Sequence, residues 1–294
     1  MRQTTIKQLL QQARERIDLL DAELIIAFVL KKTREFVIAH GECGVRKFAS
    51  AQVCKLIRKR ERGEPLAYLT GHKDFFGLDF AVNKSVLVPR PETEVLVESV
   101  IECLMTEDIG HRTILIDVGT GSGCIPIAIT KSLHHHITSS LKIFAIDISK
   151  VALRIARLNA KKHGVKIKFL HGSLLTPLLK TCKLARPQTH ALIITANLPY
   201  LTLKQYRQSA SIKREPKNAL VAGKTGLGLY EKLLKQIRSP ISNIQYPISV
   251  FFEIDPSQSK PIVRLIEKYL PKAVVEIKKD LSGRDRVVET IYFA

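Results

Sequence analysis

Apolar residues recur at helical spacing over the first 70 residues. One face of a first helix is formed by residues three and four positions apart: Ile6, Leu9, Leu10, Ala13 and Ile17. Similar spacing over residues 22–30 and 36–39 predicts two further helices. A fourth helix is expected to begin at Ser50, which can cap it, and to end at Gly63. We therefore expect a small helical domain over residues 1–70.

The pattern changes to that of strands over residues 71–94. Apolar runs at 75–82 and 86–88 flank the polar turn Asn83-Lys84-Ser85, which predicts a β-hairpin that links two domains. Two prolines then stiffen the segment Pro89-Arg90-Pro91-Glu92-Thr93-Glu94. This segment can be an ordinary helix start. It can equally cover a neighbouring ligand loop as a lid, with Arg90 and Glu92 as polar contacts.

Strands and helices alternate from residue 95 to the end. Apolar runs predict strands at 114–118, 143–147, 167–170, 191–196 and 248–254. Helices are expected over 95–105 and 227–237, and Ser149 is expected to cap another whose apolar side holds Val151, Ile155 and Leu158. The last two strands, 273–277 and 287–293, are too close in sequence for a parallel crossover and should pair antiparallel.

The prediction for residues 95–294 is therefore an α/β, Rossmann-like domain. Its sheet has seven strands, is mostly parallel with an antiparallel C-terminal edge, and carries helices on both faces.

A glycine-rich loop, Asp117-Val118-Gly119-Thr120-Gly121-Ser122-Gly123, joins the first strand of this domain to a helix. Glycine lets the backbone approach a ligand closely, and the helix start offers unpaired N–H groups. The second strand ends in Asp147, which can accept hydrogen bonds from both ribose hydroxyls. The loop differs from the G-x-G-x-x-G dinucleotide pattern. It fits S-adenosylmethionine better than NAD, because S-adenosylmethionine has no pyrophosphate to place at the start of the helix. The alternative is a plain tight connection.

The fourth strand is followed by Asn197-Leu198-Pro199-Tyr200. The Asn197 amide oxygen and the next main-chain carbonyl can accept both hydrogens of a planar –NH2 group, with Tyr200 over its plane. Such a nitrogen is a poor nucleophile, because its lone pair is delocalised, so positioning is what an enzyme can supply. A simple turn between strand and loop is the alternative reading.

The net charge and the composition exclude few of the possible functions. Lys and Arg total 47 against 27 acids among 294 residues, a formal net charge of +20. This charge favours polyanionic surroundings, either a nucleic-acid substrate or work near the ribosome, but it also suits simple solubility. One face of the fourth helix is basic and can either be solvated or contact RNA or an acidic partner. It is formed by Lys55, Arg58, Lys59, Arg60 and Arg62.

Cysteines and histidines give no metal signal. The five cysteines form no C-x-x-C pair, which favours a reducing compartment and no zinc site. His134-His135-His136 is expected to be a solvated loop. We predict a cytoplasmic protein without a membrane span, since no apolar run has the necessary length and the first residues lack a secretory signal.

The loop, Asp147 and residues 197–200 resemble the motifs of class I S-adenosylmethionine-dependent methyltransferases that act on planar nitrogens, whose usual tetrapeptide is Asn-Pro-Pro-Tyr. Further segments resemble the peptide chain release factor glutamine methyltransferases, the PrmC/HemK family, in a match that runs nearly end to end: residues 21–24, 63–68, 88–94, 214–216 and 280–286.

This resemblance implies transfer of the methyl group of S-adenosylmethionine to the side-chain amide nitrogen (N5) of the glutamine in the Gly-Gly-Gln motif of class 1 release factors. Asn197, Pro199 and Tyr200 would be catalytic, and with Leu198 they would bind the substrate. The residues implied for the cofactor are Asp117, Gly119, Thr120, Gly121, Ser122, Gly123, Asp147, Ser173, Leu174 and Asn197. Leu198 replaces a proline of the family, which should loosen the loop, and Ser173 replaces a usual acid near the adenine.

Other functions fit parts of the pattern. An adenine-N6 or other exocyclic-amine methyltransferase on DNA or RNA would share the tetrapeptide and suit the charge. Such an enzyme would be expected to bring a target-recognition domain, whereas the extra unit here is a short helical one. A nucleic-acid-binding protein with an inactive cofactor fold is a third reading. Methylation of a glutamine in a ribosomal protein is a close variant of the first.

Overall fold

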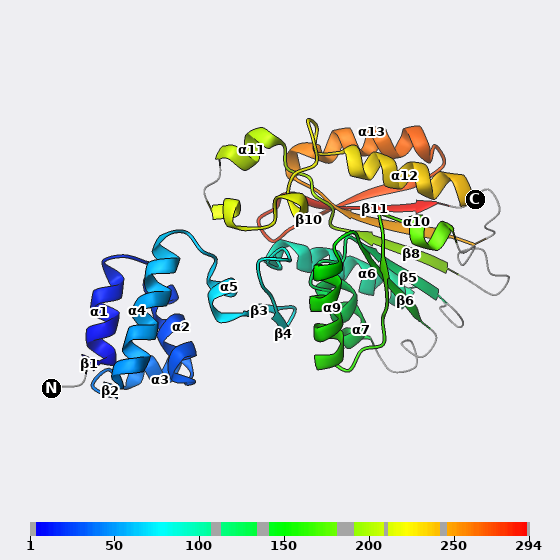
Figure 1. Cartoon of the computed structure of the whole chain (residues 1–294). Helices are drawn as coiled ribbons and strands as arrows, with labels where there is room; N and C mark the ends of the chain where they lie inside the picture. Colours follow the sequence, from blue (N-terminus) through cyan, green and yellow to red (C-terminus); the bar gives the residue numbers. More distant parts are fainter. Residues whose placement is uncertain are drawn as a thin grey trace. The chain divides into compact units, whose positions relative to one another are not determined.

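The computed structural model describes residues 4–106, 113–133, 141–180, 191–208, 211–241 and 246–292. The chain divides into two compact units, one formed by residues 1–72 with 209–214 and the other by residues 73–208 with 215–294 (Figure 1). His134 to His136, Cys182 and the end of the last predicted strand lie outside the described residues.

The first unit is helical, as the periodicity predicts. Its elements are β1 (Thr4–Thr5), α1 (Ile6–Arg14), α2 (Leu19–Leu30), α3 (Arg34–Ala39), β2 (Gly44–Val45), α4 (Lys47–Glu61) and α5 (Leu66–Thr70). The apolar faces of α1, α2 and α4 meet in one core, which includes Ile6, Ile25 and Ile57. Arg60 does not belong to an open basic face, because it is partly buried and donates to Asp21 at 2.5 Å.

The predicted start of α4 is wrong. The helix begins at Lys47 with Arg46 as its N-cap, and no side chain caps it. Ser50 lies inside the first turn, where its hydroxyl donates to the carbonyl of Lys47 at 3.0 Å. No residue of this turn is buried, so the apolar period gives no sign of the true start.

The predicted hairpin exists, but its position is wrong. Strands β3 (His72–Phe75) and β4 (Leu78–Ala81) pair across a turn at Phe76 and Gly77, both with positive φ. Two residues of this conformation match the twist of a tight hairpin. Residues 83–85 form a separate turn, in which the Asn83 side chain accepts the N–H of Ser85 at 2.9 Å, and residues 86–88 form no strand.

The second unit contains the seven-stranded sheet, which confirms the predicted architecture. Its strands are β5 (Thr113–Val118), β6 (Lys142–Asp147), β7 (Lys168–His171), β8 (Ala191–Ala196), β9 (Ile248–Glu253), β10 (Val274–Lys279) and β11 (Asp285–Tyr292). Their order is β10-β11-β9-β8-β5-β6-β7. Strands β5 to β9 run parallel, and β11 pairs antiparallel with both β9 and β10.

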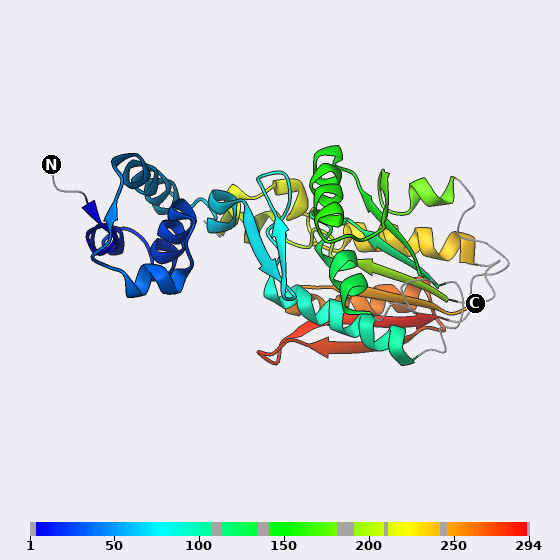
Figure 2. The same cartoon turned by 90° about the horizontal axis from the view of Figure 1, so that it is seen from below.

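Helices cover both faces of this sheet (Figure 1). Strand residues alternate between two cores, so that Ile114 and Ile116 pack with α12 (Gly228–Ile241) and α13 (Ser259–Tyr269), whereas Leu115 packs with α6 (Glu94–Thr106) and α7 (Cys124–Ser132). Helix α6 lies along β9, β10 and β11 (Figure 2). Helix α13 was not predicted from the sequence, and neither were the shorter helices α10 (Thr176–Leu179) and α11 (Leu203–Gln208).

Helix α9 (Lys150–Lys162) has the predicted cap but not the predicted face. The Ser149 hydroxyl accepts the N–H of Ala152 at 3.2 Å. Val151 and Leu158 are exposed, at 38% and 54% of their surface, and Ile155 is only partly buried. The buried side is made mainly of small residues, which allow the helix to pack closely: Ala152, Leu153, Ala156, Asn159 and Ala160.

Candidate functional site

A cavity of about 520 Å³ lies at the carboxyl ends of β5, β6 and β8. The order of the strands reverses here, because β6 continues the sheet on one side of β5 and β8 on the other. Ligands of open α/β sheets bind at such a point. Segments 85–90 and 216–219 complete the wall of the cavity.

Most of the predicted site residues meet in this cavity. The lining residues among them are Arg90, Gly119, Thr120, Gly121, Ser122, Asp147, Ser173, Leu174, Asn197, Leu198 and Pro199. Four predicted residues are not part of the lining: Asp117, Gly123, Tyr200 and Glu92. The structure therefore gathers motifs that are about 80 residues apart in the chain, but some of them only support the wall.

The glycine loop needs its glycines for backbone conformation and for space. Gly119, Gly121 and Gly123 all have positive φ, at 78°, 55° and 80°. A Cβ atom on Gly123 would lie 3.2 Å from the Cβ of Ala156, and one on Gly119 would lie 3.1 Å from Cδ2 of Leu198. The loop is thus pressed between α9 and the Leu198 side chain.

Asp147 is held at the cavity wall by two main-chain donors. Its Oδ2 accepts the N–H of Gly121 at 2.9 Å, and its Oδ1 accepts the N–H of Ser149 at 2.7 Å. Burial raises the pKa of this carboxyl, and the main-chain hydrogen bonds oppose that effect. Each oxygen keeps a lone pair with which it can accept a hydroxyl of a ligand.

Asp117 lies beneath the loop and is completely buried. Its Oδ1 accepts the hydroxyl of Thr195 on the neighbouring strand β8 at 2.8 Å, while its Oδ2 has no hydrogen-bond partner among the described residues. Burial raises the pKa of Asp117 to about 6. This carboxyl is therefore bound to the neighbouring strand and does not face the cavity.

Asn159 fixes the outer side of the loop and was not foreseen. Its Oδ1 accepts the N–H of Ala81 at 2.8 Å, and its Nδ2 donates to the carbonyls of Ala81 and Ser122 at 3.0 and 2.9 Å. One buried amide thereby joins α9, the hairpin strand β4 and the glycine loop. Its partners are 37 and 78 residues away, so no local pattern marks it.

The amide of Asn197 has a defined orientation. Its Nδ2 donates to Oε2 of Glu253 at 2.7 Å and to Oγ1 of Thr93 at 3.2 Å. Among the described residues, nothing donates to its Oδ1 within hydrogen-bond distance. The residue lines the cavity, which leaves this oxygen as an acceptor for a ligand.

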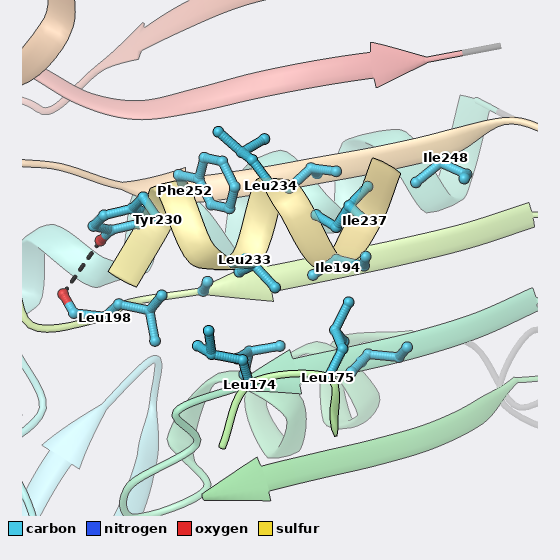
Figure 3. Packing of buried hydrophobic residues seen from close by; sticks show 14 of the residues in the cluster. Leu174, Leu175, Ile194, Leu198, Tyr230, Leu233, Leu234, Ile237, Ile248 and Phe252 are labelled. Atoms are coloured by element: carbon cyan, nitrogen blue, oxygen red, sulfur yellow. Dashed lines mark hydrogen bonds between the residues drawn. The ribbon is translucent and has the colours of Figure 1, made fainter. Parts of the chain in front are cut away.

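The carbonyl and the side chain of Leu198 are both held by the core on the α12 side of the sheet. The side chain is 4% exposed and belongs to the core that includes α12. The hydroxyl of Tyr230 on α12 lies 3.2 Å from the Leu198 carbonyl (Figure 3). The same hydroxyl donates to the Glu253 carbonyl at 2.5 Å. Packing thus anchors this position, where proline would restrict φ.

Tyr200 follows as a partly buried residue outside the cavity lining. Its carbonyl accepts Nε2 of Gln258 at 3.0 Å. Burial, together with the nearby negative charge of Glu253, raises the pKa of the Tyr200 phenol. The phenol therefore stays protonated at neutral pH.

Arg90 lines the cavity but is not a free lid residue. Its guanidinium is hydrogen-bonded to Oε1 of Glu215, whose Oε2 accepts the N–H of Val88 at 3.1 Å. Glu215 is buried, so this pair ties segment 88–90 to segment 215–219. Glu92, in contrast, is exposed.

The sequence pattern did not reveal that Glu253, Thr93 and Tyr230 are parts of the site. Glu253 ends the apolar strand β9 in the same way that Asp117 and Asp147 occur at the ends of their strands, and this signal could have identified it. Thr93 and Tyr230 carry no such mark, because their partners lie far away in the chain.

The described part of the chain contains no group of three or more His, Cys, Asp or Glu side chains that could hold a metal ion. None of its helices combines the length and apolar character needed to cross a membrane.

Comparisons with known proteins agree with this architecture. Residues 3–71 match the PrmC N-terminal domain, and residues 110–236 match a methyltransferase domain. A release factor glutamine methyltransferase of Bacillus subtilis is 33% identical over 272 residues, covering 91% of this chain and 89% of the relative. One of Dictyoglomus turgidum is 32% identical over 276 residues, covering 93% and 91%.

A solved structure, the catalytic domain of human METTL16 in complex with MAT2A 3'UTR hairpin 1, shares the fold. Its TM-score is 0.54 at 13% identity, with coverage of 91% of this chain and 90% of that one.

The strand order, the glycine loop and the methyltransferase match define a Rossmann-like class I methyltransferase. The relatives cover nine tenths of the chain, and both of its units are included. The chain belongs to the release factor glutamine methyltransferase family.

Proposed function

We propose that this protein transfers the methyl group of S-adenosylmethionine to the side-chain amide nitrogen (N5) of the glutamine in the Gly-Gly-Gln motif of class 1 peptide chain release factors. The observation that carries the proposal is the Asn197 amide, whose nitrogen is bound by Glu253 and Thr93 and whose oxygen remains an acceptor at the cavity wall. An enzyme that holds an –NH2 group needs such an acceptor.

The residues at the cavity suit the cofactor. Asp147 offers carboxylate oxygens to ribose hydroxyls, the glycine loop brings its backbone to the wall, and Ser173 and Leu174 line the adjoining side. Thr120 and Ser122 belong to the same loop, and Asp117 and Gly123 support it from outside the lining. When bound, the cofactor would supply a methyl group: the bond to sulfur would break and leave a neutral thioether as the bond to the amide nitrogen forms, and that nitrogen would release its proton to solvent.

The residues of the protein contribute by positioning the glutamine amide. Asn197 Oδ1 accepts one N–H bond of the glutamine amide, and the carbonyl of Leu198, which keeps a second lone pair beside its contact with the Tyr230 hydroxyl, accepts the other. Pro199 lines the slot around the plane of the amide, and Tyr200 supports the slot from outside the cavity lining. Fixing both hydrogens turns the nitrogen lone pair toward the methyl group, and such preorganisation can supply several kcal/mol, of the order of 7–11 at most. No strong base is required before the attack.

A second function is methylation of an exocyclic amine of DNA or RNA. The likeness to the METTL16 domain concerns the fold alone at 13% identity, while family membership favours a protein substrate. The net charge of +20 remains the feature that speaks for nucleic acid.

Release factors are proposed as transient partners, and passing proximity to the ribosome and a cytoplasmic location follow from that role. The division into a helical recognition domain over 1–70, a linker over 71–94 and a catalytic domain over 95–294 is also proposed. The match of residues 3–71 to the PrmC N-terminal domain supports it.

The test is transfer of labelled methyl from S-adenosylmethionine to a purified release factor, its Gly-Gly-Ala variant, total RNA and genomic DNA. Label on the release factor that disappears with the glutamine is expected. Asn197→Ala should lower kcat with cofactor affinity retained, whereas Asp147→Ala should mainly weaken cofactor binding. Label on nucleic acid alone would contradict the proposal.

A further inference from the structure

Glu253 is a buried acid for which packing gives no reason. It ends β9, is 1% exposed, and lies behind Asn197 as seen from the cavity, whose wall it does not reach. Burying a carboxyl costs several kcal/mol by general estimates, and an apolar side chain of similar size is often at least as stable in such a place. A group retained at this cost needs a task that an apolar residue cannot perform.

Its contacts indicate the task. Oε2 of Glu253 accepts Nδ2 of Asn197 at 2.7 Å, a short distance for a nitrogen donor. The second partner of that nitrogen, the Thr93 hydroxyl, lies 3.2 Å away and can either donate or accept. The ionised Glu253 carboxylate, in contrast, can only accept a hydrogen bond. Of the two partners, only Glu253 therefore requires that the nitrogen of the Asn197 amide, and not its oxygen, faces it.

We propose that Glu253 is a positioning residue for methyl transfer: it holds the Asn197 amide so that Oδ1 faces the substrate nitrogen. The inference rests on the proposed function. If the amide turned over, its N–H groups would point at the substrate –NH2 and could not accept from it. The carboxylate also polarises the amide, which makes Oδ1 a stronger acceptor.

The surroundings of Glu253 give the inference a pH signature. Burial raises its pKa to about 7, an effect that Glu92 increases, whereas Thr93, Arg286 and Arg90 oppose it. The phenols of Tyr200 and Tyr230 also lie near this charge. As pH falls through about 7, the carboxylate takes up a proton and ceases to be a pure acceptor, so kcat should decline with it.

Two substitutions of Glu253 distinguish a role in positioning Asn197 from a role in packing alone. Glu253→Gln keeps an oxygen that can accept from Asn197 but loses the charge, and we expect kcat to fall about tenfold. Glu253→Leu removes the acceptor, and we expect a fall of about a hundredfold, the size of the effect that a misplacement of about 1 Å can produce. The cofactor Kd and the KM for the release factor should change little in both variants.

A matched control is Glu289→Gln. Glu289 is a half-buried acid on the neighbouring strand β11, opposite Phe251 of β9, and burial raises its pKa as well. It pairs with Lys278 and makes no hydrogen bond to Asn197. Its substitution should leave kcat unchanged and should preserve the decline of kcat below about pH 7, which Glu253→Gln should abolish.

The decisive measurement is a double-mutant cycle in the release factor assay. If Glu253 acts through Asn197, Glu253→Leu should change kcat less than about twofold in an Asn197→Ala background. A full hundredfold loss in that background would overturn the inference. So would a wild-type rate in Glu253→Leu, or equal losses of kcat, cofactor affinity and melting temperature in both Glu253 variants.

Failure of the proposed function looks different. No label on the release factor with the wild-type protein would overturn that function and this inference together. A labelled release factor with unaffected Glu253 variants would overturn the inference alone.

Discussion

Neutralising Asp117 should stabilise the second unit at neutral pH. The pKa of this buried carboxyl rises from 3.8 to about 6, mainly through burial. A folded-state pKa above the unfolded value means that the folded state binds the proton more tightly. Its contribution to stability is therefore complete below about pH 4 and is lost as pH rises to about 6. A shift of about two pH units corresponds to about 3 kcal/mol.

The variant Asp117→Asn removes the charge and keeps an oxygen that can accept the Thr195 hydroxyl, now bound at 2.8 Å. Urea unfolding should be followed by circular dichroism, since the chain has no tryptophan. The difference in unfolding free energy between variant and wild type should shift in favour of the variant by about 3 kcal/mol between about pH 4 and pH 7.5. Comparing the difference at two pH values removes any constant effect of the substitution.

The matched control neutralises an exposed acid of α6, in the variant Glu98→Gln. Its difference from wild type should vary little over the same pH range, because a solvated carboxyl loses little hydration on folding. A pH-independent difference for Asp117→Asn would refute the reasoning, since it would mean that burial does not penalise the charge.

Two other substitutions test the support of the site. Tyr230→Phe leaves the buried carbonyl of Glu253 without its donor at 2.5 Å and should cost about 1–3 kcal/mol of stability, measured by thermal unfolding; an unchanged melting temperature would show that the hydroxyl contributes nothing. Gly123→Ala combines a positive φ with a contact at 3.2 Å to Ala156, so cofactor affinity measured by calorimetry should fall. Gly164 also has a positive φ but faces open space, so Gly164→Ala should destabilise the protein by about 1 kcal/mol without changing cofactor affinity. Equal losses of cofactor affinity in Gly123→Ala and Gly164→Ala would contradict the role of close packing.

Local pattern was sufficient for strands that are buried on both faces, because each forms a continuous apolar run. The strands β5, β6, β8 and β9 are recognisable because each is apolar on both faces and ends where polar residues begin. It failed where two assignments fit equally. In α9, large apolar residues occupy the exposed side and alanines the buried one, because close packing against the loop selects small side chains.

The candidate site divides in the same way. The sequence shows Asp147 and Asn197 directly, because each follows an apolar strand, and the cavity contains both. It cannot show that Asp117 lies under the loop or that Arg90 is bound to Glu215, 125 residues away. Those facts depend on which segments the sheet brings together.

By itself, the sequence determined the class of fold, the cofactor loop and the chemistry offered at the strand ends, since these follow from residue type and short-range spacing. Only the tertiary structure decided the orientation of the Asn197 amide. Its two partners, Glu253 and Thr93, are 56 and 104 residues away. They meet because β8 pairs with β9 and because the short 3-10 turn Pro91–Thr93, which precedes α6, brings Thr93 beside Asn197. Such a hydrogen bond exists only when these long-range neighbours are in place.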